Sequence, residues 1–237
     1  VVCAIGATAL TTLCAKSGIT KWRGSILEST LIPKLKVVPT IHTAMLFQEW
    51  SFRPRMVFDL SRIKEEQETP LLLLPVRKYI LEPTFEQAIE ELRRLQKSPS
   101  IQFDIELLFR DVACIGFSDS PYSSICIPFR RGDGSFYWSP ITEAAIVQEI
   151  ARLLQNPNVL KINQNIMFDI LWIYSRFGVW TIGPFMDTML LHHTLWVKLP
   201  HGLAFISTAY TREPYYKDDG RAWKPSMGDR KLWTYNC

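Results

Sequence analysis

The sequence has no closely spaced cysteine pair and no long apolar run. Its five cysteines lie far apart and form no CxxC, which argues against a disulfide framework and against a zinc site. We therefore expect reduced thiols and a cytoplasmic compartment. The densest apolar run, residues 71–74, ends at Pro75. It falls well short of the roughly 18 residues that cross a bilayer, so we expect no membrane partner.

The sequence also has little excess of one charge over the other, because 27 basic and 23 acidic side chains leave a net charge of +4. A chain so close to neutral is not a strong electrostatic binder of nucleic acid, and any such function must rest on a specific site. With 47% hydrophobic residues, the chain can bury a core, which excludes wholesale disorder. It does not begin with Met, and we expect a piece of a longer protein.

A charged, glycine-free stretch from Arg62 to Pro70 predicts a helix end followed by a linker. Before it, a strand over residues 1–5, a helix over 7–15 and a strand over 35–39 predict a partial α/β segment, residues 1–68. After it, residues 69–237 form a second α/β part. We find no internal repeat in either part.

The second part has clearer element boundaries. Thr84 and Gln87 form a capping box at the start of an amphipathic helix, and Ser139 followed by Pro140 predicts the start of another. Strands are expected over residues 76–81, 101–108, 111–117, 123–129 and 159–162, and later helices over 140–154, 166–177 and 187–196. This order, with an antiparallel meander of three strands, is typical of a ribonuclease-H-like mixed sheet flanked by helices.

Two carboxylates interrupt an apolar strand. Asp104 and Glu106 flank Ile105, and the period of two in a strand puts both on one face of the sheet. Two like charges there are unfavourable unless a cation neutralises them, and hard oxygen ligands suit Mg²⁺ or Mn²⁺. An edge strand with a solvated acidic face is the alternative interpretation.

A second polar group opens the helix expected after residue 162. Asn165 at the mouth and Asp169 one turn later lie on the same side of this helix. Phe168, Leu171 and Trp172 are expected to pack on the other side. A helix cap with a dipole-complementing Asp is the alternative, although it does not explain why the pair follows Asp104 and Glu106 in this strand order.

These residues resemble a known family. Phe103–Glu106 and Asn165–Asp169 are similar to the first two motifs of the DEDD-type proofreading 3'-5' exonuclease domain of family A DNA polymerases, and Met186–Leu190 resembles the helix that follows there. The phrases at residues 183–195 and 213–217 are similar to those of phage-type polymerases. The resemblance covers about residues 70–237.

The resemblance implies two-metal hydrolysis at a single-stranded DNA 3' end, with release of nucleoside monophosphates. Asp104, Glu106 and Asp169 would hold two Mg²⁺ or Mn²⁺ ions about 4 Å apart. Tyr235 matches the Tyr of the family's Tyr-x-x-x-Asp motif, whose Asp would fall at position 239, past the last residue. Tyr235 would orient the attacking water. The chain as it stands is therefore expected to be weakly active or inactive.

Three further residues are implied in substrate binding, namely Phe103, Asn165 and Phe168. Asp187 is expected to be a helix cap rather than a metal ligand, because Thr188 and the helix start directly follow it. The expected partners are a single-stranded DNA 3' end and a polymerase domain C-terminal to this chain, in a bacterial or phage-infected cell.

Residues 1–68 resemble the C-terminal part of a uracil-DNA glycosylase-like domain. Gly6–Leu10, Arg23–Gly24 and Val38–His42 follow the order seen in thermophile-type glycosylases. His42 would correspond to the histidine beside the flipped uracil, but Thr43 follows it instead of Pro. A loop histidine bonded to the backbone is the alternative.

Two other functions compete with a proofreading exonuclease. A ribonuclease D-like enzyme would use a similar site on RNA 3' ends. A non-catalytic nucleic-acid-binding module is the alternative from another class, because the fourth carboxylate is absent. Metal-dependent thermal stabilisation distinguishes this last alternative, since only a metal site is stabilised by Mn²⁺.

Overall fold

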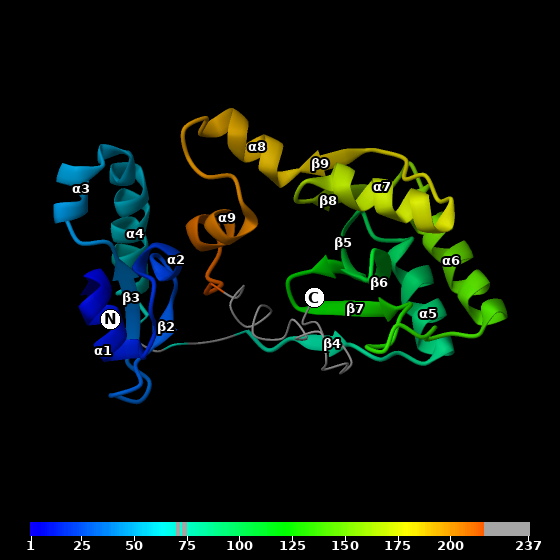
Figure 1. Ribbon diagram of the computed structural model, residues 1–237, viewed down its shortest axis with the longest axis horizontal. Coiled ribbons are helices and arrows are strands. Elements are labelled where there is room, and N and C mark those ends of the chain that lie inside the picture. The colour runs from blue at the N-terminus through cyan, green and yellow to red at the C-terminus, as the bar shows by residue number, and fades with distance from the viewer. Residues whose placement is uncertain (70–71, 73–74, 216–237) are drawn as a thin grey trace. The chain divides into compact units, whose positions relative to one another are not determined.

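Contacts within the chain divide it into two units. The structure is a computed structural model that describes residues 1–69, 72 and 75–215 (Figure 1). Residues 1–69 and 192–215 belong to one unit, and residues 75–191 form the other. No helix among these described residues combines the length and the apolar character needed to cross a membrane.

The unit of residues 75–191 is built on a six-stranded mixed sheet with the order β4-β7-β6-β5-β8-β9. Its strands are β4 (Lys78–Ile80), β5 (Ser100–Leu108), β6 (Asp111–Ser120), β7 (Ser123–Pro128), β8 (Leu160–Asn163) and β9 (Phe185–Asp187). Strands β5, β6 and β7 form the predicted antiparallel meander, whereas β8 pairs in parallel with both β5 and β9. The predicted ribonuclease-H-like α/β class is confirmed, and β9 is a strand that the sequence did not predict.

Alternation along the strands separates a core face from an open face. On β5, the side chains of Ile101, Phe103 and Ile105 are buried in the main hydrophobic core. Antiparallel pairing sets Phe103 opposite Phe117 and Ile105 opposite Ile115, which continues the apolar row across β6. The residues between them on β5 therefore point to the other face.

Three helices complete this core: α5 (Phe85–Leu95), α6 (Pro140–Leu154) and α7 (Ile166–Phe177). Both reciprocal hydrogen bonds of the Thr84–Gln87 capping box are present at the start of α5. At the start of α6, the Ser139 hydroxyl accepts a hydrogen bond from the Thr142 amide. These local signals explain why both helices begin where the sequence predicted.

The packing of α7 differs from the prediction. Phe168 and Leu171 are exposed, and the buried stripe consists of Ile166, Ile170 and Ile173 with Asp169 among them. The prediction that Phe168 and Leu171 pack inward was wrong because α7 is apolar on both sides. Hydrophobic periodicity therefore does not select a face.

The other unit has a three-stranded sheet of order β1-β3-β2. Its strands are β1 (Val2–Ile5), β2 (Leu27–Glu28) and β3 (Lys36–Thr40), and its helices are α1 (Gly6–Cys14), α2 (Ile19–Trp22), α3 (Ala44–Gln48), the 3-10 turn η1 (Trp50–Phe52), α4 (Arg53–Glu66) and α9 (Leu203–Tyr210). Helix α8 (Thr188–Leu195) begins in one unit and ends in the other. The α/β character predicted for this segment is confirmed.

Two charged residues of the stretch that begins at Arg62 lie in this unit's interior. Helix α4 continues to Glu66, and both Arg62 and Glu66 are buried. Arg62 donates to the carbonyl of Gly24, and Glu66 pairs with Lys36 at 2.6 Å. The helix end was correctly expected here, and the charges of Arg62 and Glu66 bind to other parts of the same unit.

Candidate active site

The two carboxylates on β5 lie on its open face. Asp104 is exposed and Glu106 is half-buried, while Ile105 between them is 5% exposed. Across the antiparallel pair, Asp104 lies opposite Gly116 and Glu106 opposite Cys114. Residues that pair in this way share a face of the sheet, so small side chains neighbour both carboxylates.

Strand β5 extends beyond its neighbour β8, and side chains take over the hydrogen bonds that β8 no longer makes. The pairing of β5 with β8 ends at Gln102. Beyond it, the Phe103 amide donates to Oδ1 of Asn163 at 3.3 Å, and Nδ2 of Asn163 donates back to the Phe103 carbonyl. The Ile105 amide donates to Oδ1 of Asp169 at 3.2 Å. These bonds tie the start of α7 to the strand that carries Asp104.

Asp169 is buried beside a second carboxylate. Its side chain is 2% exposed, and burial followed by the negative charge of Asp104 raises the pKa of Asp169 to about 7. Hydrogen bonds from the Ile105 amide and from Asn163 act in the opposite direction without reversing the shift. The fold therefore brings together two carboxylates that lie on different elements.

A carboxylate pair of this kind has the donor chemistry of a magnesium or manganese site. Hard oxygen ligands suit these ions, and a cation would relieve both the repulsion and the burial of charge. Within the described part of the chain, however, no three His, Cys, Asp or Glu side chains converge closely enough to hold a metal as they stand. Asp104 and Asp169 offer the oxygen ligands that such an ion needs, and Glu106 lies two residues further along β5 on the same face as Asp104.

The turn before α7 has an unusual backbone. Asn165 has φ 60° and ψ 49°, in the left-handed region, and makes no side-chain cap for α7. Asn adopts this conformation more readily than most residues. The carboxylate of Asp187 instead accepts hydrogen bonds from the amides of Asn165 and Ile166, at 3.1 and 3.0 Å.

Asp187 also caps the next helix, as the sequence predicted. Its Oδ1 accepts from the amides of Met189 at 2.8 Å and Leu190 at 3.4 Å in the first turn of α8. The sequence did not reveal its contact with α7. To predict this contact one has to know that β9 pairs in parallel with β8, which sets Asp187 opposite Asn163.

The remaining site residues differ in their placement. Phe103 is 3% exposed and packs near Phe117 in the core, on the face opposite Asp104, so the structure gives no support to a substrate contact by its side chain. Phe168 is 46% exposed on the first turn of α7. Asn165 is exposed at the helix mouth. Tyr235 lies outside the described residues.

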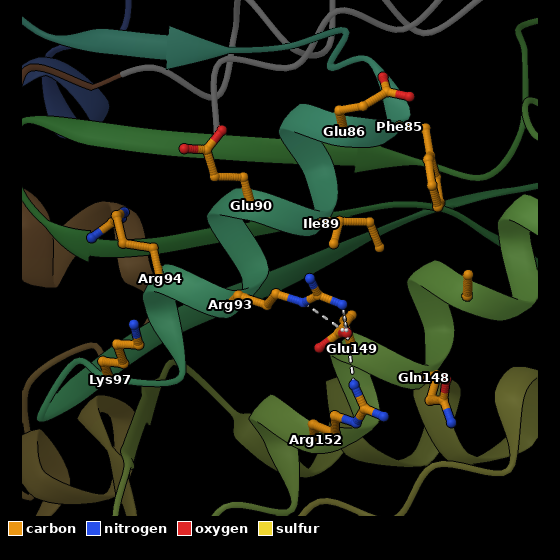
Figure 2. A pocket seen from close by; sticks show the side chains of 11 residues that line it. Phe85, Glu86, Ile89, Glu90, Arg93, Arg94, Lys97, Gln148, Glu149 and Arg152 are labelled. Atoms are coloured by element: carbon orange, nitrogen blue, oxygen red, sulfur yellow. Dashed lines mark hydrogen bonds and ion pairs between the residues drawn. The ribbon is translucent and has the colours of Figure 1, made fainter.

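A hollow of about 820 Å³ lies away from these carboxylates, between α5 and α6. Figure 2 shows Arg93 and Arg152 directed at Glu149 within it. Glu149 is buried, and its Oε1 lies 2.9 Å from Nη2 of Arg93 and 2.7 Å from Nη1 of Arg152. Among the described residues, none of the predicted site residues lines this hollow, and we assign it no part in the site.

In the other unit, His42 is exposed in the loop after β3. Its Nδ1 accepts a hydrogen bond from the Ala44 amide at 3.1 Å. This is the backbone bond expected of a loop histidine. The resemblance of this segment to glycosylases stays a prediction.

Comparison with known proteins identifies related sequences and folds. Residues 82–223, more than half of the chain, match a family described as 3'-5' exonuclease. The DNA polymerase of Bacillus phage SP01 is 25% identical over 218 residues, which cover 79% of this chain and 23% of that polymerase. The chain thus spans about a quarter of the length of this relative.

Several solved structures are also similar. The catalytic core of RRP6 from Trypanosoma brucei matches with 17% identity and a TM-score of 0.48, over 73% of this chain and 46% of that one. Escherichia coli RNase D matches with 17% identity and a TM-score of 0.44, over 65% and 39%. Brucella melitensis NrnC, solved with bound Mg²⁺, matches with 15% identity and a TM-score of 0.42, over 66% and 67%.

Proposed function

Because the chain belongs to the 3'-5' exonuclease family, we propose that its carboxylate site hydrolyses phosphodiester bonds at the 3' end of single-stranded DNA, as the proofreading part of a DNA polymerase. The observation that carries the site is the burial of Asp169 beside Asp104. The polymerase context is supported by the similarity to the phage polymerase.

In this proposal, Asp104, Glu106 and Asp169 hold divalent metal. Bound Mg²⁺ or Mn²⁺ supplies an activated water and neutralises charge at the leaving oxygen. Asp169 is held in place by the Ile105 amide, Asp104 carries the neighbouring charge on β5, and Glu106 lies on the same face of β5 as Asp104. Localisation in the cytoplasm belongs to the proposal as well.

Substrate contacts are proposed for residues at the mouth of α7. Phe168 is exposed directly beside Asp169, where an aromatic ring can stack on a base of the terminal nucleotides. Asn165, exposed at the same mouth, can position the DNA strand. Tyr235 is proposed to orient the attacking water, on its match to the third motif alone.

The domain boundary after residue 68 is part of the same proposal. Residues 69–237 would carry the exonuclease and residues 1–68 a partial glycosylase-like segment. The family match, which begins at residue 82, supports the first assignment. The α/β build of the N-terminal segment, with β1 parallel to β3, supports the second.

The test is digestion of a 5'-labelled single-stranded oligonucleotide with Mn²⁺. We expect slow removal of single nucleotides from the 3' end, blocked by EDTA. Asp104→Ala should lower the rate about a hundredfold or more, as for loss of an electrostatic group in a transition state, while the exposed Glu90→Gln variant on α5 should match the parent chain. Near-parental digestion by Asp104→Ala would contradict the site, and preference for RNA of the same sequence would favour the ribonuclease D-like alternative.

A further inference from the structure

The carboxylate of Asp187 joins the starts of two helices. It accepts four backbone hydrogen bonds, from Asn165 and Ile166 at the start of α7 and from Met189 and Leu190 at the start of α8. An ordinary helix cap serves only its own helix. The contact with α7 crosses 21 to 22 residues of sequence, so local capping does not account for it.

Helix α7 depends on this remote carboxylate because its own N-cap position provides no side-chain bond. The first amides of a helix have no partner within the helix and need an acceptor. Asp187 provides one for Ile166, and its negative charge is favourable beside the positive end of a helix dipole. A second contact holds the same turn, because the Thr188 hydroxyl donates to the Asn163 carbonyl at 3.2 Å.

The turn held by Asp187 sets the position of Asp169. Asp169 is the fourth residue of α7, so a shift of the first turn moves its carboxylate directly. On its other side, Asp169 is bonded to the Ile105 amide of β5. The distance between Asp169 and Asp104 is therefore determined by how α7 is seated on the ends of β8 and β9.

We propose that Asp187 is a positioning residue for the metal site: by binding the amides that open α7, it fixes the separation of the Asp169 and Asp104 carboxylates. This inference rests on the proposed function. Asp187 is not itself a metal ligand in this proposal, because its carboxylate already accepts four backbone hydrogen bonds, about as many as its lone pairs can take. Residues that orient metal ligands typically change metal affinity or activity 10- to 100-fold when they are replaced.

The experiment compares the parent chain with Asp187→Ala, Asp187→Asn and the charge-matched control Glu90→Gln. Mn²⁺ affinity is measured by electron paramagnetic resonance, well below the melting temperature of each variant. We expect Asp187→Ala to raise the Mn²⁺ dissociation constant about tenfold or more. Asp187→Asn should raise it less, because its amide oxygen can keep the bonds made by Oδ1. Glu90→Gln should match the parent.

Hydrogen exchange without metal provides the second measurement. If Asp187 positions α7, exchange in Asp187→Ala should increase at residues 164–168 and stay unchanged in α5 and α6. A merely structural role would instead increase exchange throughout the unit and leave the Mn²⁺ affinity of the folded protein unchanged, and that result would overturn the proposal. Should Asp187→Ala fail to fold, the same two measurements on Asp187→Asn decide.

The failure of this proposal differs from a failure of the proposed function. A parent chain that binds no Mn²⁺ contradicts the metal site and this inference together. A parent chain that binds Mn²⁺ through Asp104, with equal affinity in both Asp187 variants, overturns only the positioning role.

Discussion

Replacement of Asp169 by Asn tests the electrostatics of the site without any activity measurement. In the metal-free chain, burial and the Asp104 charge raise the pKa of Asp169 to about 7. Asn has nearly the same shape as the protonated acid, and its Oδ1 can keep the bond from the Ile105 amide. The variant therefore mimics the neutral state at every pH.

The magnitude follows from the shift. The pKa rises from the ordinary value of 3.8 to about 7, so protonated Asp169 contributes about 4 kcal/mol to the free energy of unfolding, at 1.36 kcal/mol per pKa unit. Because the folded-state pKa is raised, this contribution is fully present below the unfolded-state pKa and is lost as the pH rises through about 7. Between pH 5 and pH 8 the loss amounts to roughly 2 to 3 kcal/mol.

The assay is urea unfolding in EDTA at several pH values, followed by tryptophan fluorescence. We expect the parent chain to lose stability toward pH 8 relative to Asp169→Asn, and Mn²⁺ at pH 8 to restore the parent but not the variant. Glu90→Gln serves as the control that removes an exposed carboxylate. Equal pH dependence of the parent and Asp169→Asn would refute the reasoning, because it would mean that Asp169 is not buried beside a like charge.

Two further predictions concern buried groups outside the site. Glu149→Gln should lower the free energy of unfolding by about 1 kcal/mol. This is at the low end for a buried charged acceptor, because the side chains of its partners Arg93 and Arg152 are more than half exposed. Urea unfolding measures the change, and an unchanged midpoint would contradict the prediction. His192 is 3% exposed, and burial followed by the charge of His201 lowers its pKa. The unit of residues 1–69 and 192–215 should therefore lose stability as the pH falls below the ordinary histidine pKa of about 6.5. Urea unfolding at several pH values should show a flatter pH profile for His192→Phe, and an identical profile would contradict this prediction.

Local sequence signals predicted much of the fold correctly. The Thr84–Gln87 capping box and the Ser139 cap define helix starts through contacts three residues apart, which a sequence shows directly. Alternation along β5 correctly placed Asp104 and Glu106 on one face because Phe103 and Ile105 are unambiguously core residues. In each case the deciding interaction is short-range.

The errors arose where distant segments decide the structure. Strand β9 has only three residues, too few for a periodic pattern, and its place is fixed by pairing with β8. Helix α7 is apolar on both sides, so its buried face is chosen by the sheet beneath it. The stretch that holds Arg62 and Glu66 was predicted only as a helix end and a linker, because their partners Gly24 and Lys36 lie some 30 to 40 residues earlier in the chain.

The carboxylate site depends on the relative lengths of three strands. Strand β5 continues past the end of β8, which leaves the amides of Phe103 and Ile105 for side chains to bind. The residue that ends β8, Asn163, serves one of these amides, and Asp187, its partner at the end of β9, serves the helix that follows β8. A polar residue at each strand end thus satisfies backbone groups that the neighbouring element leaves unpaired. Lengthening β8 by one residue would replace the Asn163 bonds with ordinary pairing and displace Asp169 from Asp104, so the short strand is itself a requirement of the site.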